Sequence, residues 1–295
     1  MDVVVALDIG GTKMAAGLVS LDGKVLRRHE VPTEGPDAEA LFARVAGLLD
    51  DTLRAATAAG HHPIVCGVGC GGPMTPGGEE VSPLNIHQWR GFPLRRRVAE
   101  RVGLLTAVDN DAKALALAEG WRGAAQGMQS YIGMVVSTGV GGGIVVDGRL
   151  LDGDTGNAGH IGHVVVEPDG RPCVCGGRGC LEALISGPSI KSITGQPPES
   201  ASLETIERAG LLLGRALTSV MALLDLRLAT VAGSVALGFG APFFAAAQAE
   251  LDRHARIEYL HDPTVVPGGL GADGPLVGAA AVGLRTLRLG GVTDG

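Results

Sequence analysis

Aromatic residues are scarce in this chain, making up 3% of its 295 residues. So few rings cannot provide the stacking platforms on which many proteins bind single-stranded bases. Basic residues are outnumbered too, because 24 lysines and arginines stand against 31 aspartates and glutamates and leave a net charge of −7. A phosphate backbone repels such a surface. We therefore expect no nucleic-acid partner.

Long hydrophobic runs and targeting signals are also missing. No apolar run reaches the roughly 20 residues that a bilayer-spanning helix needs. The first apolar segment, residues 3–7, follows no basic region of the kind that opens a signal peptide. We expect a cytoplasmic protein with no membrane partner, and its hydrophobic content of 45% is enough for a large core in one or two domains.

Glycine, in contrast, is abundant, with 48 residues. One glycine turn follows the first apolar run and reads Asp8-Ile9-Gly10-Gly11-Thr12-Lys13. Its backbone amides can approach a phosphate because no Cβ intrudes, while Thr12 adds a hydroxyl and Lys13 a cation. Asp8, at the strand end, can hold Mg²⁺ through water. The spacing fits neither a Walker A loop nor a dinucleotide fingerprint.

The order of the first 31 residues recurs in the middle of the chain. Both segments read as strand, glycine turn, strand, Asp-Gly hairpin and strand. The second glycine turn reads Ser137-Thr138-Gly139-Val140-Gly141-Gly142-Gly143. We interpret this as an internal duplication that sets two glycine turns on opposite sides of one cleft. Two unrelated three-stranded meanders are the alternative.

The other elements follow from hydrophobic periodicity and turn residues. We expect helices at 37–59, 92–102, 112–119, 203–226 and 278–289, and strands at 63–69, 105–108, 131–136, 144–146 and 229–234. The sequence Asp109-Asn110-Asp111 ends one of these strands. A carboxylate there can accept the proton of an attacking hydroxyl, and an amide can bind sugar hydroxyls. The same residues also suit a helix N-cap.

The five cysteines are uneven in spacing, which does not fit a disulfide framework. Three of them, Cys173, Cys175 and Cys180, follow His163 closely, and glycines separate them. One imidazole and three thiolates match a closed, tetrahedral Zn²⁺ site of structural type. Buried free cysteines are the alternative.

In these motifs the chain resembles the ROK family of bacterial sugar kinases over nearly its full length. The matching segments are 8–13, 85–89, 109–111, 137–143, 159–163 and 173–182. The resemblance implies an α/β protein with the two-lobed, actin-like ATPase fold that sugar kinases share with Hsp70 and actin, built from duplicated βββαβα units. It implies a small lobe at 1–112, joined by a C-terminal helix at 281–295, and a large lobe at 113–280 with the zinc loop.

The resemblance also implies roles for individual residues. Asp111 would be the catalytic base of a kinase that uses ATP, Mg²⁺ and a structural Zn²⁺. ATP would bind at Asp8, Gly10, Gly11, Thr12, Lys13, Ser137, Thr138, Gly139, Gly233 and Ser234. The sugar would bind at Gly72, Asn85, Asn110, Asp111, His160, His163 and Glu182. The zinc ligands would be His163, Cys173, Cys175 and Cys180. A homodimer or homotetramer is expected.

His160 departs from the pattern of the family's common glucokinases, which have a glutamate at this position. A neutral imidazole accepts one hydrogen bond, fewer than a carboxylate does. The position is similar to that of bacterial N-acetylmannosamine kinases. We therefore expect phosphorylation of the 6-hydroxyl of a hexose or amino-hexose, with a substrate altered at C2 favoured over glucose. A strict glucokinase, and a structural role for His160 beside the zinc loop, are the alternatives.

Two non-enzymatic functions also compete. The family contains sugar-sensing repressors that carry a DNA-binding segment ahead of the first glycine loop, and here seven residues precede Asp8 in an acidic chain. A sugar-binding protein without kinase activity is the other, and the presence of both Asp8 and Asp111 argues against it. The remaining histidines, His61 among them, lack a site context and are expected at the surface.

Overall fold

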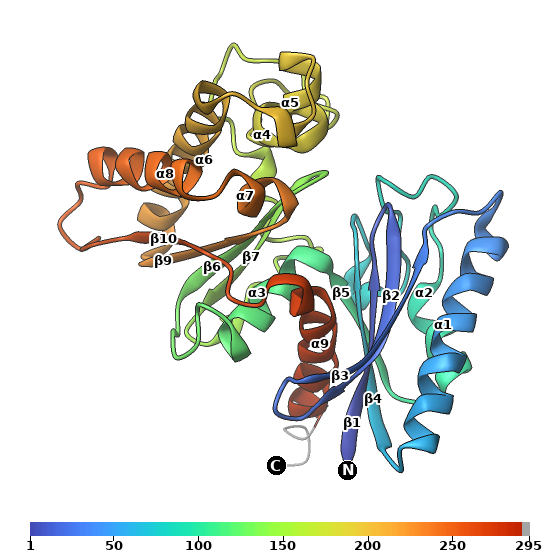
Figure 1. The fold of residues 1–295 in the computed structure, drawn as a ribbon. Helices are drawn as coiled ribbons and strands as arrows, with labels where there is room; N and C mark the ends of the chain where they lie inside the picture. The colour runs from blue at the N-terminus through green and yellow to red at the C-terminus, as the bar shows by residue number, and fades with distance from the viewer. Residues whose placement is uncertain (291–295) are drawn as a thin grey trace. The chain divides into compact units, whose positions relative to one another are not determined.

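The computed structural model describes residues 1–290, which form two compact units (Figure 1). The first unit contains Met1–Arg122, Asp152–Ala158 and the described part of Ala272–Gly295. The second contains Gly123–Leu151 and Gly159–Gly271. The contacts thus divide the chain at residues other than the expected 112/113 and 280/281. The expected C-terminal helix starts earlier, at Gly274, and its residues 291–295 lie outside the described residues.

The first unit is a five-stranded sheet covered by helices. Its strands are β1 (Asp2–Ile9), β2 (Lys13–Ser20), β3 (Val25–Pro32), β4 (His62–Cys70) and β5 (Thr106–Asn110), in the order β3-β2-β1-β4-β5. Its helices are α1 (Ala38–Ala58), α2 (Leu94–Val102), α3 (Asp111–Arg122) and α9 (Gly274–Gly290), with a short 3-10 turn at Pro76–Gly78. Helix α1, in blue, lies on one face of the sheet and α9, in red, on the other (Figure 1).

The second unit has the same plan. Its strands are β6 (Tyr131–Val136), β7 (Val140–Val146), β8 (Arg149–Leu150), β9 (Leu228–Ala232) and β10 (Thr264–Pro267), in the order β10-β9-β6-β7-β8. Its helices are α4 (Glu182–Ile185), α5 (Gly187–Thr194), α6 (Leu203–Leu224), α7 (Ser234–Phe239) and α8 (Ala241–His254). Further 3-10 turns of this unit lie at Ile161–His163 and Pro198–Ser200, and another, Gly271–Asp273, lies where the chain returns to the first unit.

Strand pairing confirms the duplication. In each unit the first strand is antiparallel to the second and parallel to the fourth: β1 with β2 and β4, and β6 with β7 and β9. Each second strand then pairs antiparallel with the third. The β7–β8 hairpin closes on Asp147-Gly148, both with positive φ, as a two-residue turn requires. Two unrelated meanders would not share this pairing.

One expectation about the second glycine turn was wrong. Strand β7 begins at Val140, so the turn is confined to Ser137–Gly139 and the three following glycines pair with β6. At Gly142 another segment of backbone comes close to the strand: a Cβ on Gly142 would lie 3.2 Å from the Gly159 carbonyl oxygen. These glycines therefore allow close packing within the sheet region instead of forming a loop.

Each unit has its own hydrophobic core. In the first, α1 begins at an Asp37 N-cap, whose carboxylate accepts from Ala40 N at 2.8 Å, and it buries an apolar stripe against the sheet. On the opposite face α9 packs closely on β4, where Gly67 meets the backbone of Ala279. In the second, α6 and α8 cover β6 and β9. The segment from 235 to 273, which the sequence left unassigned, contains α7, α8 and β10.

Helices in the described part of the chain lack the combination of length and apolar character that crossing a bilayer demands.

Candidate active site

The first glycine turn joins β1 to β2 in the first unit. Gly10 N donates to Lys13 O at 3.0 Å, and Thr33 Oγ1 donates to Gly10 O at 2.7 Å, so both ends of the turn are fixed. Gly11 has no room for a side chain, because a Cβ there would lie 2.6 Å from Asn85 Cβ. The structure thus brings together the expected phosphate turn and the expected sugar loop.

The sugar loop is anchored by a buried aromatic pair. Trp89 is fully buried, stacks on Phe92 with centroids 4.5 Å apart, and donates from Nε1 to Ala38 O at 3.3 Å. Leu84 N donates to Gly72 O at 3.2 Å, so Gly72 lies next to the chain segment that carries Asn85. The side chain of Asn85 is exposed. Both expected sugar-loop residues therefore lie in one rigid loop.

Lys13 makes a contact that the sequence did not indicate. Its ammonium lies 3.1 Å from a carboxylate oxygen of Glu30 on β3, and Arg28 Nε lies 3.1 Å from the same oxygen. Arg28 also reaches Asp273, at 3.5 Å, on the segment before α9. Lys13 is largely exposed, so a phosphate can compete with Glu30 for it.

Asp8 and Asp111 lie on either side of Gly69 on β4. A Cβ on Gly69 would be 3.6 Å from Asp8 Oδ1 and 3.7 Å from Asp111 Cα. Burial, and then the negative charge of Asp111, raises the pKa of Asp8 to about 7. A bound cation would favour the ionised form of Asp8, because it would offset both effects.

The strand end at 109–111, an expected functional site, also forms a helix cap. Asn110 Oδ1 accepts from Ala112 N at 3.0 Å, which is the N-cap arrangement, and Asp111 is the first residue of α3. The carboxylate of Asp111 accepts from the same amide at 2.9 Å, and its side chain is exposed. The cap interpretation therefore holds for Asn110, while Asp111 is an exposed carboxylate stabilised at a helix N-terminus.

The second glycine turn, in the second unit, is fixed by hydrogen bonds at both ends. Ser137 N donates to Gly139 O at 2.9 Å, and Gly187 N donates to Ser137 O at 2.8 Å. Val140 N donates to a carboxylate oxygen of Glu182 at 2.8 Å. The amides of Thr138 and Gly139 donate to no atom among residues 1–290, so they can serve an anionic ligand.

A pocket of about 410 Å³ opens beside this turn. Ser137 and Ser234 both line it, and their hydroxyl oxygens lie 2.9 Å apart, within hydrogen-bond distance. Gly233, which precedes α7, has a φ of +99° and leaves no space for a Cβ against the backbone of Val136. Thr138, also expected from the sequence, lines it too. The other lining residues were not singled out by the sequence: Gly187, Pro188, Pro198, Glu199, Ala201, Ile206, Val235, Gly238 and Phe239. In the sequence, the prolines between α5 and α6 were the feature that could have indicated this part of the pocket lining.

The predicted metal ligands converge in the second unit. One ligand atom from each of His163, Cys173, Cys175 and Cys180 lies within 4.8 Å of the others. His163 Nδ1 is 3.8 Å from Cys173 Sγ, and the sulfurs of Cys175 and Cys180 are 3.7 Å apart. A tetrahedron with zinc–sulfur bonds of about 2.3 Å has edges of roughly 3.8 Å, so the cluster fits zinc.

His160 and His163 lie near each other on the segment that enters this cluster. Their ring centroids are 6.2 Å apart and their planes differ by 13°. Because His163 turns Nδ1 toward Cys173, its Nε2 is left for another partner. The side chain of His160 is exposed.

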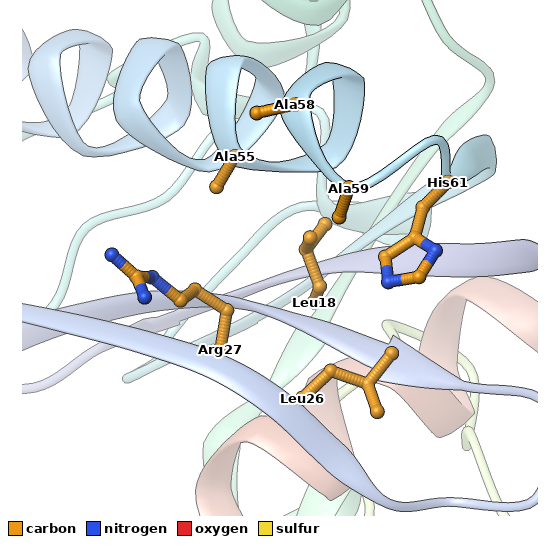
Figure 2. Close-up of a pocket in the computed structure, with 7 residues that line it drawn as sticks. All are labelled: Leu18, Leu26, Arg27, Ala55, Ala58, Ala59 and His61. Carbon is orange, nitrogen blue, oxygen red and sulfur yellow. The ribbon is translucent and has the colours of Figure 1, made fainter.

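A further hollow, of about 370 Å³, lies in the first unit between α1 and the β2–β3 hairpin. Figure 2 shows Arg27 and His61 at opposite ends of it, with Leu18 and Leu26 between them. Apart from these two polar side chains its lining is apolar, and it contains none of the expected site residues.

The comparisons with known proteins agree with this geometry. A family model described as the ROK family matches residues 4–285. A glucokinase of Halalkalibacterium halodurans is 38% identical over 199 residues, which cover 64% of this chain and 58% of that protein. A glucokinase of Streptomyces coelicolor is 34% identical over 287 residues, covering 94% and 85%. An N-acetylmannosamine kinase of Escherichia fergusonii is 36% identical over 256 residues, covering 80% and 84%.

Solved structures show the same likeness. A ROK hexokinase from Thermus thermophilus has a TM-score of 0.84 at 32% identity and covers 97% of this chain and 99% of its own. A ROK family glucokinase from Streptomyces griseus, solved with glucose and AMPPNP, has a TM-score of 0.82 at 29% identity, covering 96% and 99%. The fold is the two-lobed, actin-like fold expected from the sequence. With a family model matched over almost all of its length, the chain belongs to the ROK family.

Proposed function

We propose that this protein transfers the γ-phosphoryl group of ATP to the 6-hydroxyl of a hexose or amino-hexose. The observation that carries the proposal is the exposed carboxylate of Asp111 at the start of α3, beside the buried Asp8 and the first glycine turn. A phosphoryl transfer needs a proton acceptor and a cradle for phosphate oxygens in this combination. Relatives named glucokinase and N-acetylmannosamine kinase support it.

In the proposed mechanism the first unit handles the proton. The 6-hydroxyl gives its proton to Asp111 as its oxygen forms a bond to the γ-phosphorus, and the bond from that phosphorus to the bridging β–γ oxygen breaks. Asn110 and Asn85 orient sugar hydroxyls. Asp8, at the end of β1, would hold Mg²⁺ through water. A bound Mg²⁺ neutralises charge on the phosphate oxygens.

Backbone amides stabilise the remaining negative charge. In the first unit these are the amides of Gly11 and Thr12, together with the ammonium of Lys13, whereas the Gly10 amide already donates to Lys13 O. In the second they are Thr138 and Gly139, whose N–H groups have no acceptor among the described residues. The pocket lined by Ser137 and Ser234 would take the adenosine, because its apolar floor suits a base and its hydroxyls suit the ribose.

The His/Cys cluster would hold Zn²⁺ in a structural role. All four positions of a tetrahedral ion are filled by His163, Cys173, Cys175 and Cys180, which leaves none for substrate. The cluster fixes the orientation of the His163 ring, so its Nε2 can face a sugar hydroxyl. The metal content of purified protein, measured by atomic emission, checks this assignment.

The kinase assignment is tested with Asp111→Asn. This variant keeps the shape of the side chain and its bond to Ala112 N but cannot accept the proton. We expect kcat to fall by at least about 1,000-fold in a coupled ADP assay, within the range seen when a catalytic acid or base is lost. Sugar affinity, measured by calorimetry, should stay within about threefold. Turnover near the wild-type rate would remove Asp111 from this role.

The sugar is tested at His160. Because the imidazole offers one acceptor where a glutamate offers several, we propose a substrate modified at C2, such as an N-acyl amino-hexose. Wild-type kcat/KM is compared across glucose, mannose, glucosamine, N-acetylglucosamine and N-acetylmannosamine. We expect His160→Glu to raise the ratio of kcat/KM for glucose to kcat/KM for N-acetylmannosamine by about tenfold, because the glutamate would add one hydrogen bond to a charged group. A wild-type preference for glucose of tenfold or more would favour a strict glucokinase.

A regulatory function is the second candidate. A ROK family transcriptional regulator has a TM-score of 0.83 at 23% identity, which shows the fold alone. The ADP assay separates the two functions, since a sugar sensor binds sugar without turnover. Assembly into two or four copies and a cytoplasmic location also remain proposals, and light scattering of purified protein gives the number of subunits.

A further inference from the structure

The carboxylate of Glu182 packs against the second glycine turn and the first residue of β7. Its carboxylate oxygen Oε2 accepts from Val140 N at 2.8 Å. The same oxygen would lie 2.9 Å from a Cβ on Gly139, so the carboxylate rests directly against the turn. An ionised acceptor makes a stronger hydrogen bond to an amide than a neutral one does.

The segment that carries Glu182 is itself held firmly. Leu181 is fully buried, and its N–H donates to Val164 O at 2.9 Å. Val164 directly follows the cluster residue His163, and Leu181 directly follows Cys180, so one hydrogen bond joins the two arms of the cluster. The Glu182 carbonyl oxygen also accepts from Ser189 Oγ at 2.9 Å. The backbone of Glu182, from which the carboxylate extends, is therefore held in place.

The turn is held from the same segment at a second point, where Gly187 N donates to Ser137 O. With Ser137 O and Val140 N both engaged, two amides between them are left without an acceptor in the described residues, those of Thr138 and Gly139. The contacts of residues 182–187 thus determine which N–H groups of the turn are available to a ligand.

We propose that Glu182 is a positioning residue for nucleotide binding: it holds the Ser137–Gly139 turn so that the Thr138 and Gly139 amides face the phosphates. This role is separate from any contact with sugar, and it rests on the proposed ATP-dependent function. It requires an acceptor for Val140 N at this position, and not a negative charge as such.

The test measures affinity for a non-hydrolysable ATP analogue with Mg²⁺, by calorimetry and in the absence of sugar. We expect Glu182→Ala to raise the Kd about tenfold, the effect of one lost hydrogen bond to a charged acceptor. Glu182→Gln retains an amide oxygen that can accept from Val140 N, so its Kd should stay within about threefold of wild type. Glu207→Ala, an exposed substitution on α6 of the same unit, is the matched control and should change nothing.

Gly139→Ala approaches the same contact from the turn. Its Cβ would lie 2.9 Å from Glu182 Oε2, so it should weaken analogue binding by a similar factor. In the double variant Gly139→Ala/Glu182→Ala this clash is absent. Its Kd should therefore be no higher than that of Glu182→Ala alone, a non-additive result that independent effects on folding would not give.

The outcomes separate the two proposals. If wild-type protein fails to bind the analogue, the ATP-dependent function is overturned and this inference with it. If wild type binds and Glu182→Ala binds equally well, the inference alone is overturned. Thermal unfolding of each variant, together with its zinc content, establishes that the cluster is intact.

Discussion

Two carboxyl groups of the first unit, Asp8 and Asp111, lie close together in different surroundings. Asp111 is exposed at the N-terminus of α3, where the helix dipole favours an anion. Asp8 lies at the end of a central strand, and burial followed by the charge of Asp111 raises its pKa to about 7. The two groups therefore have different electrostatic environments, and a cation beside Asp8 would favour its ionised form.

The raised pKa of Asp8 predicts a pH-dependent stability. Asp8 binds its proton more tightly in the folded chain than in the unfolded chain, so folding loses stability as pH rises from about 4 to about 7. Asp8→Asn removes this loss. Between pH 4 and pH 8, we expect the free energy of unfolding of the variant, measured in urea, to rise by at least about 2 kcal/mol relative to that of wild type. Each unit of pKa difference corresponds to about 1.4 kcal/mol. Parallel stability curves for the two proteins would contradict it.

At the scale of elements, the close contact between β4 and α9 depends on one glycine. A Cβ on Gly67 would overlap the backbone of Ala279, so β4 and α9 would have to move apart. We expect Gly67→Ala to lower the free energy of unfolding by about 2 kcal/mol or more, the usual result of overpacking. Gly47→Ala in α1 is the control: nothing lies within 4 Å of its added Cβ, so higher helix propensity should make it neutral or stabilising. Equal effects would contradict the packing argument.

The elements also show where sequence patterns succeed. Periodicity placed α1 and α6 to within two residues, because each has a long apolar stripe and a capping residue, Asp37 or Ser202. The same approach failed at Gly141–Gly143, since a run of glycines resembles a loop until its strand partner and its close packing are known. It also left α8 unassigned, because the alanines of this helix give only a weak periodic signal.

For the candidate site, sequence motifs predicted the groups but not their contacts. The four cluster residues are close in sequence, and their convergence could be foreseen from spacing alone. The bonds of Lys13 to Glu30 and of Glu182 to Val140 could not, since each joins segments brought together by folding. The lining of the pocket beside Ser137 was missed for the same reason.

At the scale of the whole molecule, the chain passes repeatedly from one unit to the other. The short segment Asp152–Ala158 belongs to the first unit although residues of the second precede and follow it. Charges hold it there. The ammonium of Lys113 lies 2.8 Å from Asp152 and 2.9 Å from Asp109, and Arg285 on α9 reaches Asp152 at 2.6 Å. This network joins three segments of the first unit that are distant in sequence: residues 109–113, Asp152 and Arg285.

Lys113 is the buried centre of the network, with a side chain 3% exposed. Lys113→Met keeps the apolar stem but takes from the buried Asp109, whose pKa burial already raises, its nearer cation, and leaves only the 3.5 Å contact with Arg285. We expect a loss of about 3 kcal/mol in urea unfolding, as for other broken buried pairs. Lys24→Met, an exposed substitution in the same unit, should change stability by less than about 0.5 kcal/mol.

A double variant shows whether the loss comes from the stranded carboxyl group. Adding Asp109→Asn to Lys113→Met removes the buried carboxyl group that lost its nearer cation, so the double variant should be more stable than the sum of the single effects predicts. Additive losses would mean that Lys113 stabilises the chain by packing alone. Recovery in the double variant would show that the cost of losing Lys113 comes from the buried carboxyl group of Asp109, four residues earlier in the chain, which the ammonium neutralises in the folded first unit.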